Sequence, residues 1–263
     1  MRAAIENWIL QHWYGRGRPP WYLRLLEPVY RAGFQRSQKK GQSVQNRFRP
    51  KLPLIVVGNI TAGGSGKTPL VIRLCELAGS MGLKAGIATT GYGRNGRDTL
   101  LVEADGDADV CGDEPVLLAR RTGVPVVVAR SRLEAVKKLS EMNLDLMVSD
   151  DGLQQANLDR DMDICVVDGE RGLGNGHLIP AGPLRESADL LAQFDYVFSN
   201  GEWSAGPGEL EVHVFLLAID ELAFADINRT ILDLATCRHT GLPLPEVLSI
   251  EDMLPSLAGC GLS

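Results

Sequence analysis

Residues 54–68 read Leu-Ile-Val-Val-Gly-Asn-Ile-Thr-Ala-Gly-Gly-Ser-Gly-Lys-Thr, and this stretch decides the fold. A short apolar run leads into a glycine-rich loop, and the loop leads into a segment with helical periodicity. Glycines let backbone N–H groups wrap an anion, the lysine balances phosphate charge, and the threonine hydroxyl can ligate Mg²⁺. The pattern predicts a nucleoside-triphosphate site between a strand and a helix. The alternative is an ordinary flexible glycine turn.

The residues expected to hold the nucleotide follow one another along the loop: Thr61, Ala62, Gly63, Gly64, Ser65, Gly66, Lys67 and Thr68. One position departs from the common pattern, because Thr61 stands five residues before Gly66, where glycine is usual. Strand, loop, Gly-Lys-Thr and helix nevertheless occur in the required order. This order favours the phosphate loop over the simple turn.

Apolar strand patterns alternate with helical patterns from residue 54 to about residue 200. We expect strands near 54–58, 84–89, 124–128, 144–149, 164–167 and 195–199, and helices near 67–80, 114–122, 131–142 and 187–193. Such alternation predicts an α/β fold of the P-loop NTPase type, a mostly parallel sheet flanked by helices. The pattern weakens after residue 200, where residues 212–217 form a further candidate strand.

The overall composition is that of a globular protein, with 44% hydrophobic residues among 263. The five cysteines are scattered along the chain: Cys75, Cys111, Cys165, Cys237 and Cys260. Their odd number and the lack of a C-x-x-C pair argue against a disulfide framework or a zinc site, and they fit a reducing compartment.

The first 51 residues differ from the rest of the chain in charge. They hold eleven Lys and Arg residues against two acidic ones, a net charge of +9, whereas the whole chain carries −6. They also hold three of the four tryptophans and three of the five tyrosines. We expect amphipathic helical stripes over residues 5–13 and 22–29, with Pro28 kinking or ending the second and residues 35–50 forming a connector.

A basic, aromatic, amphipathic segment suits an anionic membrane surface. Two alternatives remain open at this point: the basic residues could bind nucleic acid, or the aromatic side chains could pack on the main domain. No apolar run approaches the roughly 18 residues needed to span a bilayer. Glu6 interrupts the early apolar stretch, so we do not expect a secretory signal.

Acidic residues lie next to apolar segments at two places in the sequence, once after a predicted strand and once before a predicted helix. Asp150 and Asp151 come directly after the apolar run 144–149, as in nucleotide sites where a strand delivers an aspartate to the metal. An apolar strand ending in Asp-Gly is also an ordinary turn. Asp113 and Glu114 precede an apolar helix, where acids are favoured simply as helix starters.

Taken together, these motifs resemble one family, the tetraacyldisaccharide 4′-kinases, which phosphorylate a lipid A precursor. The resemblance runs from Trp13-Tyr14 and Pro20-Trp21-Tyr22 to about residue 190. Between them it includes residues 57–61 with the loop, Gly91-Tyr92-Gly93-Arg94, Gly112-Asp113-Glu114-Pro115, residues 150–154, Gly174-Asn175-Gly176 and residues 180–186. The family also accepts threonine at the position of Thr61.

The resemblance implies roles for individual residues. Asp113, Lys67 and Asp151 would be catalytic, with Asp113 activating the sugar hydroxyl. Thr61 through Thr68 would cradle ATP. Thr68, Glu114 and Asp150 would surround Mg²⁺. Tyr92, Arg132, Gln154 and Glu186 match further active-site positions, expected to meet the substrate.

The resemblance also implies an organisation and a cellular setting. Residues 1–51 would form a basic, aromatic, membrane-proximal helical segment, 52–200 a P-loop kinase core, and 201–263 an incomplete or divergent carboxy-terminal lobe. The enzyme would move the γ-phosphate of ATP to the 4′-hydroxyl of a tetraacyldisaccharide 1-phosphate. It would work as a monomer, bound peripherally through residues 1–34 to the cytoplasmic face of the inner membrane, with no nucleic-acid partner.

Three positions depart from the family pattern. Thr90 stands where arginine is expected before Gly-Tyr-Gly, and Gln155 stands where histidine is expected. The carboxy-terminal Asp-His-His motif is not recognisable, because His213 and His239 are the histidines after residue 200 and neither has that context. A shortened chain, an altered reading frame or lost activity would each account for this. The alternative function is therefore a membrane-associated ATP-binding protein without lipid phosphoryl transfer.

Overall fold

The computed structural model describes residues 2–15, 17–43, 47–91, 93–94, 96–201, 216–217, 227 and 229–231. Within these residues one sheet has eight strands, in the order β3-β4-β2-β5-β1-β6-β7-β8. The strands are β1 (Leu54–Gly58), β2 (Ala85–Thr89), β3 (Leu100–Val102), β4 (Val126–Val128), β5 (Leu146–Asp150), β6 (Met162–Asp168), β7 (Tyr196–Asn200) and β8 (Leu216–Leu217). The helices are α1 (Arg2–Tyr14), α2 (Trp21–Gly41), α3 (Lys67–Ser80), α4 (Ala108–Cys111), α5 (Asp113–Thr122), α6 (Arg132–Leu139) and the 3₁₀ helix η1 (Ala188–Gln193).

β1 lies near the middle of the sheet and is paired in parallel on both sides. Its residues are all buried, and it runs beside β5 and β6. β3 pairs antiparallel with β4, and the other pairings are parallel. Strands buried on both faces read as continuous apolar runs, which is why these runs located the strands in the sequence.

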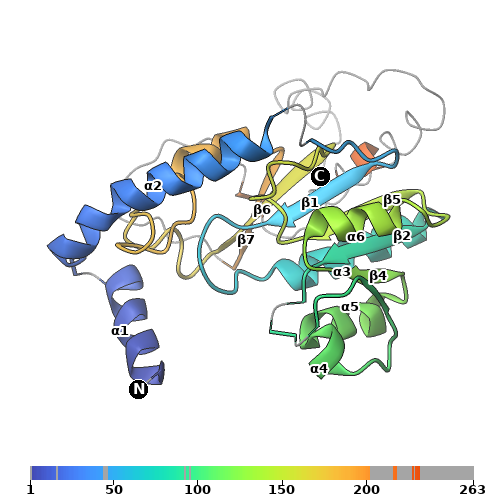
Figure 1. The fold of residues 1–263 in the computed structure, drawn as a ribbon, viewed down its shortest axis with the longest axis horizontal. Helices are drawn as coiled ribbons and strands as arrows, with labels where there is room; N and C mark the ends of the chain where they lie inside the picture. The colour runs from blue at the N-terminus through green and yellow to red at the C-terminus, as the bar shows by residue number, and fades with distance from the viewer. Residues whose placement is uncertain are drawn as a thin grey trace, which may run out of the picture.

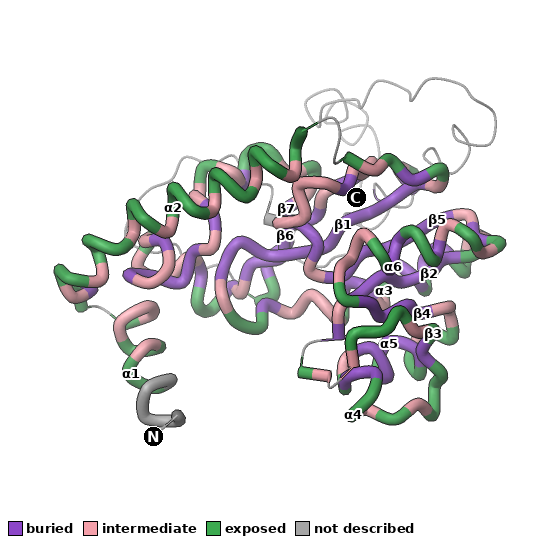
Figure 2. Tube along the Cα trace, viewed as in Figure 1, coloured by how far each residue is buried: buried purple, intermediate pink, exposed green. Residues whose placement is uncertain are grey.

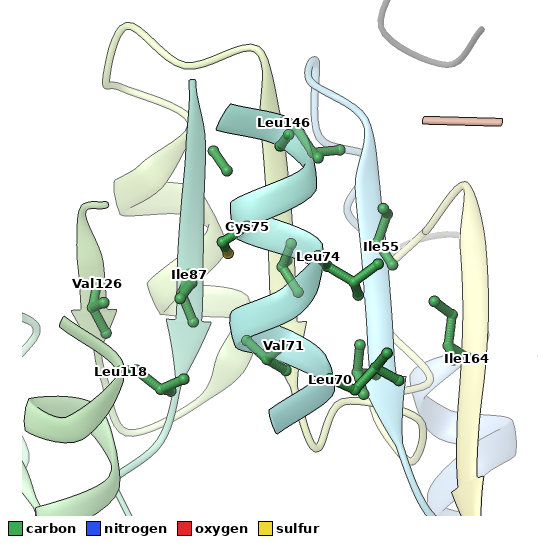
Figure 3. Packing of buried hydrophobic residues seen from close by; sticks show 14 of the residues in the cluster. Ile55, Leu70, Val71, Leu74, Cys75, Ile87, Leu118, Val126, Leu146 and Ile164 are labelled. Carbon is green, nitrogen blue, oxygen red and sulfur yellow. The ribbon is translucent and has the colours of Figure 1, made fainter. Parts of the chain in front are cut away.

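Side chains of β1 alternate between two core layers. Ile55 and Val57 pack with Leu70 and Leu74 of α3 on one face of the sheet (Figure 3). Leu54 and Val56 face the other layer, which α6 and the segment following β5 cover. Each fully buried leucine or isoleucine stabilises the fold by about 1.5–3 kcal/mol. The two layers hold the carboxyl ends of β1 and β5 side by side, where the phosphate loop begins.

The expected strands and helices of the core are confirmed. Six strands and four helices lie where the periodicity predicted them, to within a few residues at their ends. β3 and α4 were not predicted, because each is too short to show a period. Of the candidate strand at 212–217, residues 216–217 form β8, and the others lie outside the described residues. Most of the expected lobe 201–263 also lies outside them.

The expectation for α2 was wrong in two respects. The helix continues through Pro28 to Gly41, so of the two alternatives for Pro28 the helix end was wrong, and residues 35–41 are not a connector. Proline removes one backbone donor, at a cost of about 3 kcal/mol. Contacts on both sides of Pro28 hold the helix against the core: the Glu27 carboxylate lies 3.1 Å from His177 Nδ1, and Gln38 Nε2 donates to the Gln154 carbonyl at 3.2 Å.

α2 lies along one side of the molecule and reaches beyond the sheet (Figure 1). None of its residues is buried, and Figure 2 shows its surface as mostly exposed. Trp21, Leu25 and Val29 are 72%, 65% and 69% exposed. In the described part of the chain, no helix combines the length and apolar character that a bilayer crossing requires.

Candidate active site

The phosphate loop joins β1 to α3. Gly66 precedes α3 with φ of 85°, a conformation that favours glycine, and a Cβ there would lie 2.4 Å from Asn200 Nδ2. Asn59 is buried below the loop, and its Nδ2 donates to the Gly63 carbonyl at 3.3 Å. The Ser65 hydroxyl is buried and has no hydrogen-bond partner among the described residues. Such a loop presents backbone and hydroxyl donors to an anion.

Thr61 has a structural reason to differ from glycine. It forms an antiparallel bridge with Leu184, and the flanking amides complete the pairing. Ala62 N donates to the Pro183 carbonyl and Arg185 N donates to the Ile60 carbonyl, both at 2.7 Å. Thr61 is therefore extended, and its φ is not positive. A β-branched residue suits that conformation, so this part of the loop does not require glycine.

Asp150 and Asp151 lie at the carboxyl end of β5. Asp150 pairs in register with Val57, which brings both acids to the edge of the sheet where the phosphate loop begins. Asp151 has φ of 53°, the one positive φ among described non-glycine residues. Aspartate tolerates this conformation better than most residues, although it is still strained. The turn places the Asp151 carboxylate beside Lys67, Arg132 and Arg185.

Three cationic side chains converge on Asp151. Lys67 Nζ lies 3.7 Å from its carboxylate, Arg132 Nη2 lies at 3.4 Å, and Arg185 Nη1 lies at 3.4 Å. Each comes from a different element, since Lys67 begins α3 and Arg132 begins α6. Arg132 Nε also donates to the Asp150 carbonyl at 2.7 Å. Asp150 and Glu114 also act electrostatically on Arg132, so the three cations and these carboxyl groups form one mixed-charge cluster beside the phosphate loop.

Burial shifts the pKa of two groups in this cluster. The Asp150 carboxyl is 2% exposed, and burial followed by the nearby Glu114 charge raises its pKa to about 7. Its Oδ1 has no hydrogen-bond partner among the described residues. Burial also lowers the pKa of Arg132, which the charges of Asp151 and Asp150 oppose. Perturbed groups of this kind cluster at functional sites.

Glu114 reaches the phosphate loop from the first turn of α5. Thr68 Oγ1 donates to Glu114 Oε1 at 2.5 Å. Gly112 precedes α5 with φ of 92°, and a Cβ there would lie 3.2 Å from the Gly91 Cα, so the two glycine motifs approach closely. Asp113 is the first residue of α5 and is exposed. Its interpretation as a helix starter is confirmed, and its catalytic role stays a prediction.

Gln154 and Glu186 contact each other, as part of a network below the loop. Gln154 Nε2 donates to Glu186 Oε1 at 2.7 Å and to the Asn59 carbonyl at 3.0 Å. Burial raises the pKa of Glu186, and the hydrogen bond from Gln154 opposes that rise. The two residues are thus joined to the loop through Asn59. Tyr92, the remaining predicted substrate residue, lies outside the described residues.

Thr68, Glu114 and Asp150 fit a magnesium ion by their chemistry. They supply a hydroxyl and two carboxylates, the oxygen ligands that Mg²⁺ prefers, and Asp150 Oδ1 is a buried acceptor without a donor. In the part of the chain that the structure describes, no three Asp, Glu, His or Cys side chains form a metal cluster of their own. Magnesium usually keeps water and phosphate ligands beside one or two carboxylates, so a smaller set is sufficient.

Four residues of the site were not predicted as site residues. Arg185 contacts Asp151, Asn59 supports the loop, Asn200 packs against Gly66, and Tyr14 OH donates to the Ala62 carbonyl at 3.3 Å. Arg185, Tyr14 and Asn59 lie in the motifs that carry the family resemblance, which was the available signal. Asn200 carries no local pattern, because its role comes from the placement of β7 beside β6.

Comparisons with known proteins agree with this geometry. The family model for tetraacyldisaccharide-1-P 4′-kinase matches residues 19–230. The tetraacyldisaccharide 4′-kinase of Azotobacter vinelandii is 44% identical over 209 residues, covering 78% of this chain and 62% of that protein. That of Stenotrophomonas maltophilia is 48% identical over 190 residues, covering 70% and 55%. This chain therefore spans about three fifths of the length of these relatives.

A solved structure shares the fold. The crystal structure of the "apo" form of LpxK from Aquifex aeolicus in complex with ATP superposes with a TM-score of 0.59 at 28% identity, covering 70% of this chain and 60% of that one. The family model and the relatives each cover well over half of this chain. The chain belongs to the tetraacyldisaccharide 4′-kinase family.

Proposed function

We propose that this protein is an ATP-dependent kinase that phosphorylates the 4′-hydroxyl of a tetraacyldisaccharide 1-phosphate in lipid A biosynthesis. The observation that carries the proposal is the convergence of Lys67, Arg132 and Arg185 on Asp151 beside a phosphate loop. Phosphoryl transfer consists mainly of positioning and charge stabilisation, and this arrangement supplies both. Relatives named for this activity and a relative solved with ATP support the assignment.

The nucleotide would lie along Thr61 to Thr68, with its phosphates on the backbone N–H groups of the loop. Lys67 is paired with Asp151 at 3.7 Å, and a γ-phosphate would compete with that carboxylate for the lysine. Arg132 and Arg185 would then face the negative charge that spreads over the transferred group. Asp151 would keep the three cations apart and oriented before the nucleotide binds.

Mg²⁺, when bound, would neutralise phosphate charge, as it does in other nucleotide sites. Thr68, Glu114 and Asp150 would hold it. Asp150 would have to lose the proton that its raised pKa retains near pH 7. The Thr68 hydroxyl, which donates to Glu114 here, would turn its oxygen toward the ion.

Asp113 would accept the proton of the 4′-hydroxyl as its oxygen attacks the γ-phosphorus and ADP leaves. It adjoins Glu114, whose side chain contacts the loop, yet it remains exposed to an incoming acceptor. Gln154 and Glu186 would position the acceptor sugar from the other side of Asn59. Tyr92 would contact substrate as well.

The acceptor would come from a membrane surface. Trp21, Leu25 and Val29 form an exposed apolar row on α2, with Arg24 and Arg31 nearby in the same helix. The opposite face contacts the site, because Tyr30 OH donates to the Arg185 carbonyl at 3.1 Å. This division of faces favours membrane contact over packing for α2, and residues 1–34 would bind the cytoplasmic face of the inner membrane peripherally. The functional units would be 1–51, 52–200 and 201–263, in a monomer.

Transfer of radiolabel from [γ-³²P]ATP to the tetraacyldisaccharide 1-phosphate in mixed micelles tests the proposal. Lys67→Ala provides the control, with turnover lower by at least about a hundredfold because transition-state charge stabilisation is lost. Absence of transfer by folded, ATP-binding protein would overturn it in favour of a membrane-associated ATP-binding protein.

A further inference from the structure

The Gly174-Asn175-Gly176 motif contacts the end of α1. Asn175 N donates to the Trp13 carbonyl at 2.8 Å, and Asn175 Nδ2 donates to the His12 carbonyl at 3.0 Å. The last four carbonyls of a helix have no partner within it, so Asn175 caps α1 from a distant part of the chain. Asn175 Nδ2 also donates to the Ala181 carbonyl at 2.9 Å, which joins the cap to the segment 180–186.

The approach is too close for a side chain at Gly174. A Cβ there would lie 2.6 Å from the Trp13 carbonyl oxygen, and the φ of Gly174 is 60°. Trp13 Nε1 donates to the Pro180 carbonyl at 3.1 Å. The carboxyl end of α1 is therefore docked by backbone and side-chain hydrogen bonds to residues 174–181, although other side chains of α1, such as Trp8 and Leu10, are exposed.

Tyr14, the last residue of α1, contacts the phosphate loop directly. Its hydroxyl donates to the Ala62 carbonyl at 3.3 Å, and the Arg171 guanidinium lies over its ring at 5.7 Å from the centroid. Burial raises the pKa of Tyr14, so the hydroxyl remains a donor at physiological pH. The Ala62 amide donates to the Pro183 carbonyl at 2.7 Å.

Both backbone polar groups of Ala62 are therefore held by the structure that docks α1. Tyr14 holds the carbonyl, and Pro183, in the segment that Asn175 joins to the cap, holds the amide. Ala62 lies four residues before Gly66, so its orientation sets the entry of the chain into the anion-binding part of the loop. A loop fixed in its binding conformation binds its ligand more tightly than one that must be ordered.

We propose that Tyr14 and Asn175 are positioning residues that couple the docking of α1 to the conformation of the phosphate loop. The inference rests on the proposed nucleotide site and deepens it, since a segment proposed to contact the membrane then influences ATP affinity. Coupling between two sites is reciprocal. ATP binding must therefore stabilise the docked end of α1 by the same factor by which docking strengthens ATP binding.

Tyr14→Phe removes the hydroxyl and keeps the ring. We expect calorimetry on the full chain to show ATP bound about three- to tenfold more weakly, the value of one hydrogen bond. The KM for ATP should rise by a similar factor while kcat changes little. Tyr196→Phe is the matched control. The Tyr196 hydroxyl forms a hydrogen bond with Thr230. Tyr196 is the first residue of β7, so it lies at the end of the parallel strands opposite the phosphate loop.

Hydrogen exchange of a peptide covering residues 8–15 measures the reciprocal effect. Saturating ATP should slow exchange in the wild type and in Tyr196→Phe, and should do so less in Tyr14→Phe. Asn175→Asp, which loses both Nδ2 donors and keeps the acceptor for His177 N, should speed exchange and weaken ATP binding. If folded Tyr14→Phe and Asn175→Asp both bind ATP with wild-type affinity and show the wild-type exchange response, this inference is wrong and the proposed function still stands. Absence of ATP binding by the wild type would overturn the proposed function, and the inference with it.

Discussion

Lys67 Nζ lies 3.7 Å from Asp151 Oδ1, and this pair joins the phosphate loop to the end of β5. The lysine begins α3, whereas the aspartate follows a strand 84 positions later in the chain. Both side chains are largely shielded, at 12% and 26% exposure. The pair holds the lysine side chain toward the carboxyl end of β5.

Arg185 offers a test of residues found through the structure. Arg185→Ala should lower turnover by about ten- to a hundredfold, because one of three cations facing the transferred phosphate is lost. Steady-state assays with ATP and glycolipid measure the effect. Arg73→Ala is the matched control, since Arg73 is half exposed in a surface pair with Glu76 and should retain wild-type turnover. Equal turnover of the two variants would remove Arg185 from the mechanism.

Asp113→Ala separates catalysis from helix initiation. As the proposed base, Asp113 acts on the acceptor hydroxyl, so transfer should fall at least about a hundredfold while ATP affinity persists. A helix starter would instead cost about 1 kcal/mol of stability and leave turnover intact. Asp107→Ala is the control for the second behaviour, because Asp107 caps α4 by accepting from Asp109 N. Melting and rate are measured on both variants.

Asp150→Asn tests the raised pKa of the buried carboxyl. The folded-state pKa is about 7, well above the 3.8 of an unperturbed aspartate, so the folded protein binds the proton more tightly. Between these pH values the free energy of unfolding therefore falls as pH rises. Without Mg²⁺, Asp150→Asn should be more stable than the wild type at pH 8, by up to about 4 kcal/mol, with the difference shrinking toward pH 4.

Urea unfolding in EDTA from pH 4 to pH 8 measures this difference. Asp105→Asn, at an exposed turn, should leave the pH dependence of the wild type unchanged. Added Mg²⁺ and ATP should raise the melting temperature of the wild type and have a smaller effect on Asp150→Asn, which lacks a carboxylate for the ion. A wild-type pH dependence in Asp150→Asn would contradict the assignment of the shift to this residue.

Leu25→Glu on α2 tests the membrane surface. Leu25 is 65% exposed, so the change should not disturb the core, but it places a charge where the apolar row would enter the interface. Sedimentation with anionic vesicles should fall, and the apparent KM for glycolipid should rise with ATP affinity unchanged. Leu117→Glu, at a 47% exposed position on α5, is the control. At high salt the charges of the basic residues are screened. If Leu25→Glu then sediments with vesicles as well as the wild type does, the apolar row of α2 is not the membrane-binding surface.

The local pattern of residues 54–68 was sufficient for the phosphate loop, and the alternation of apolar runs was sufficient for the parallel core. Both are short-range properties: a buried parallel strand must be apolar throughout, and a loop that wraps phosphate must be rich in glycine. The path of α2 could not be predicted in this way. Pro28 is a local signal for a helix end, and contacts of Glu27 and Gln38 with distant residues outweigh it.

The identity of the acids was evident from the sequence, and their arrangement was not. That Asp150 is buried beside Glu114, whereas Asp151 turns toward Lys67, Arg132 and Arg185, depends on the register of β5 with β1 and on the positive φ at residue 151. Arg185 and Tyr14 both contact the chain where the loop begins, at Ile60 and Ala62, but they lie about 120 and 50 positions from it along the chain. Chemistry was encoded by residue type and local order, whereas the contacts among these side chains were decided by strand pairing and long-range packing, which leave no periodic trace in the sequence.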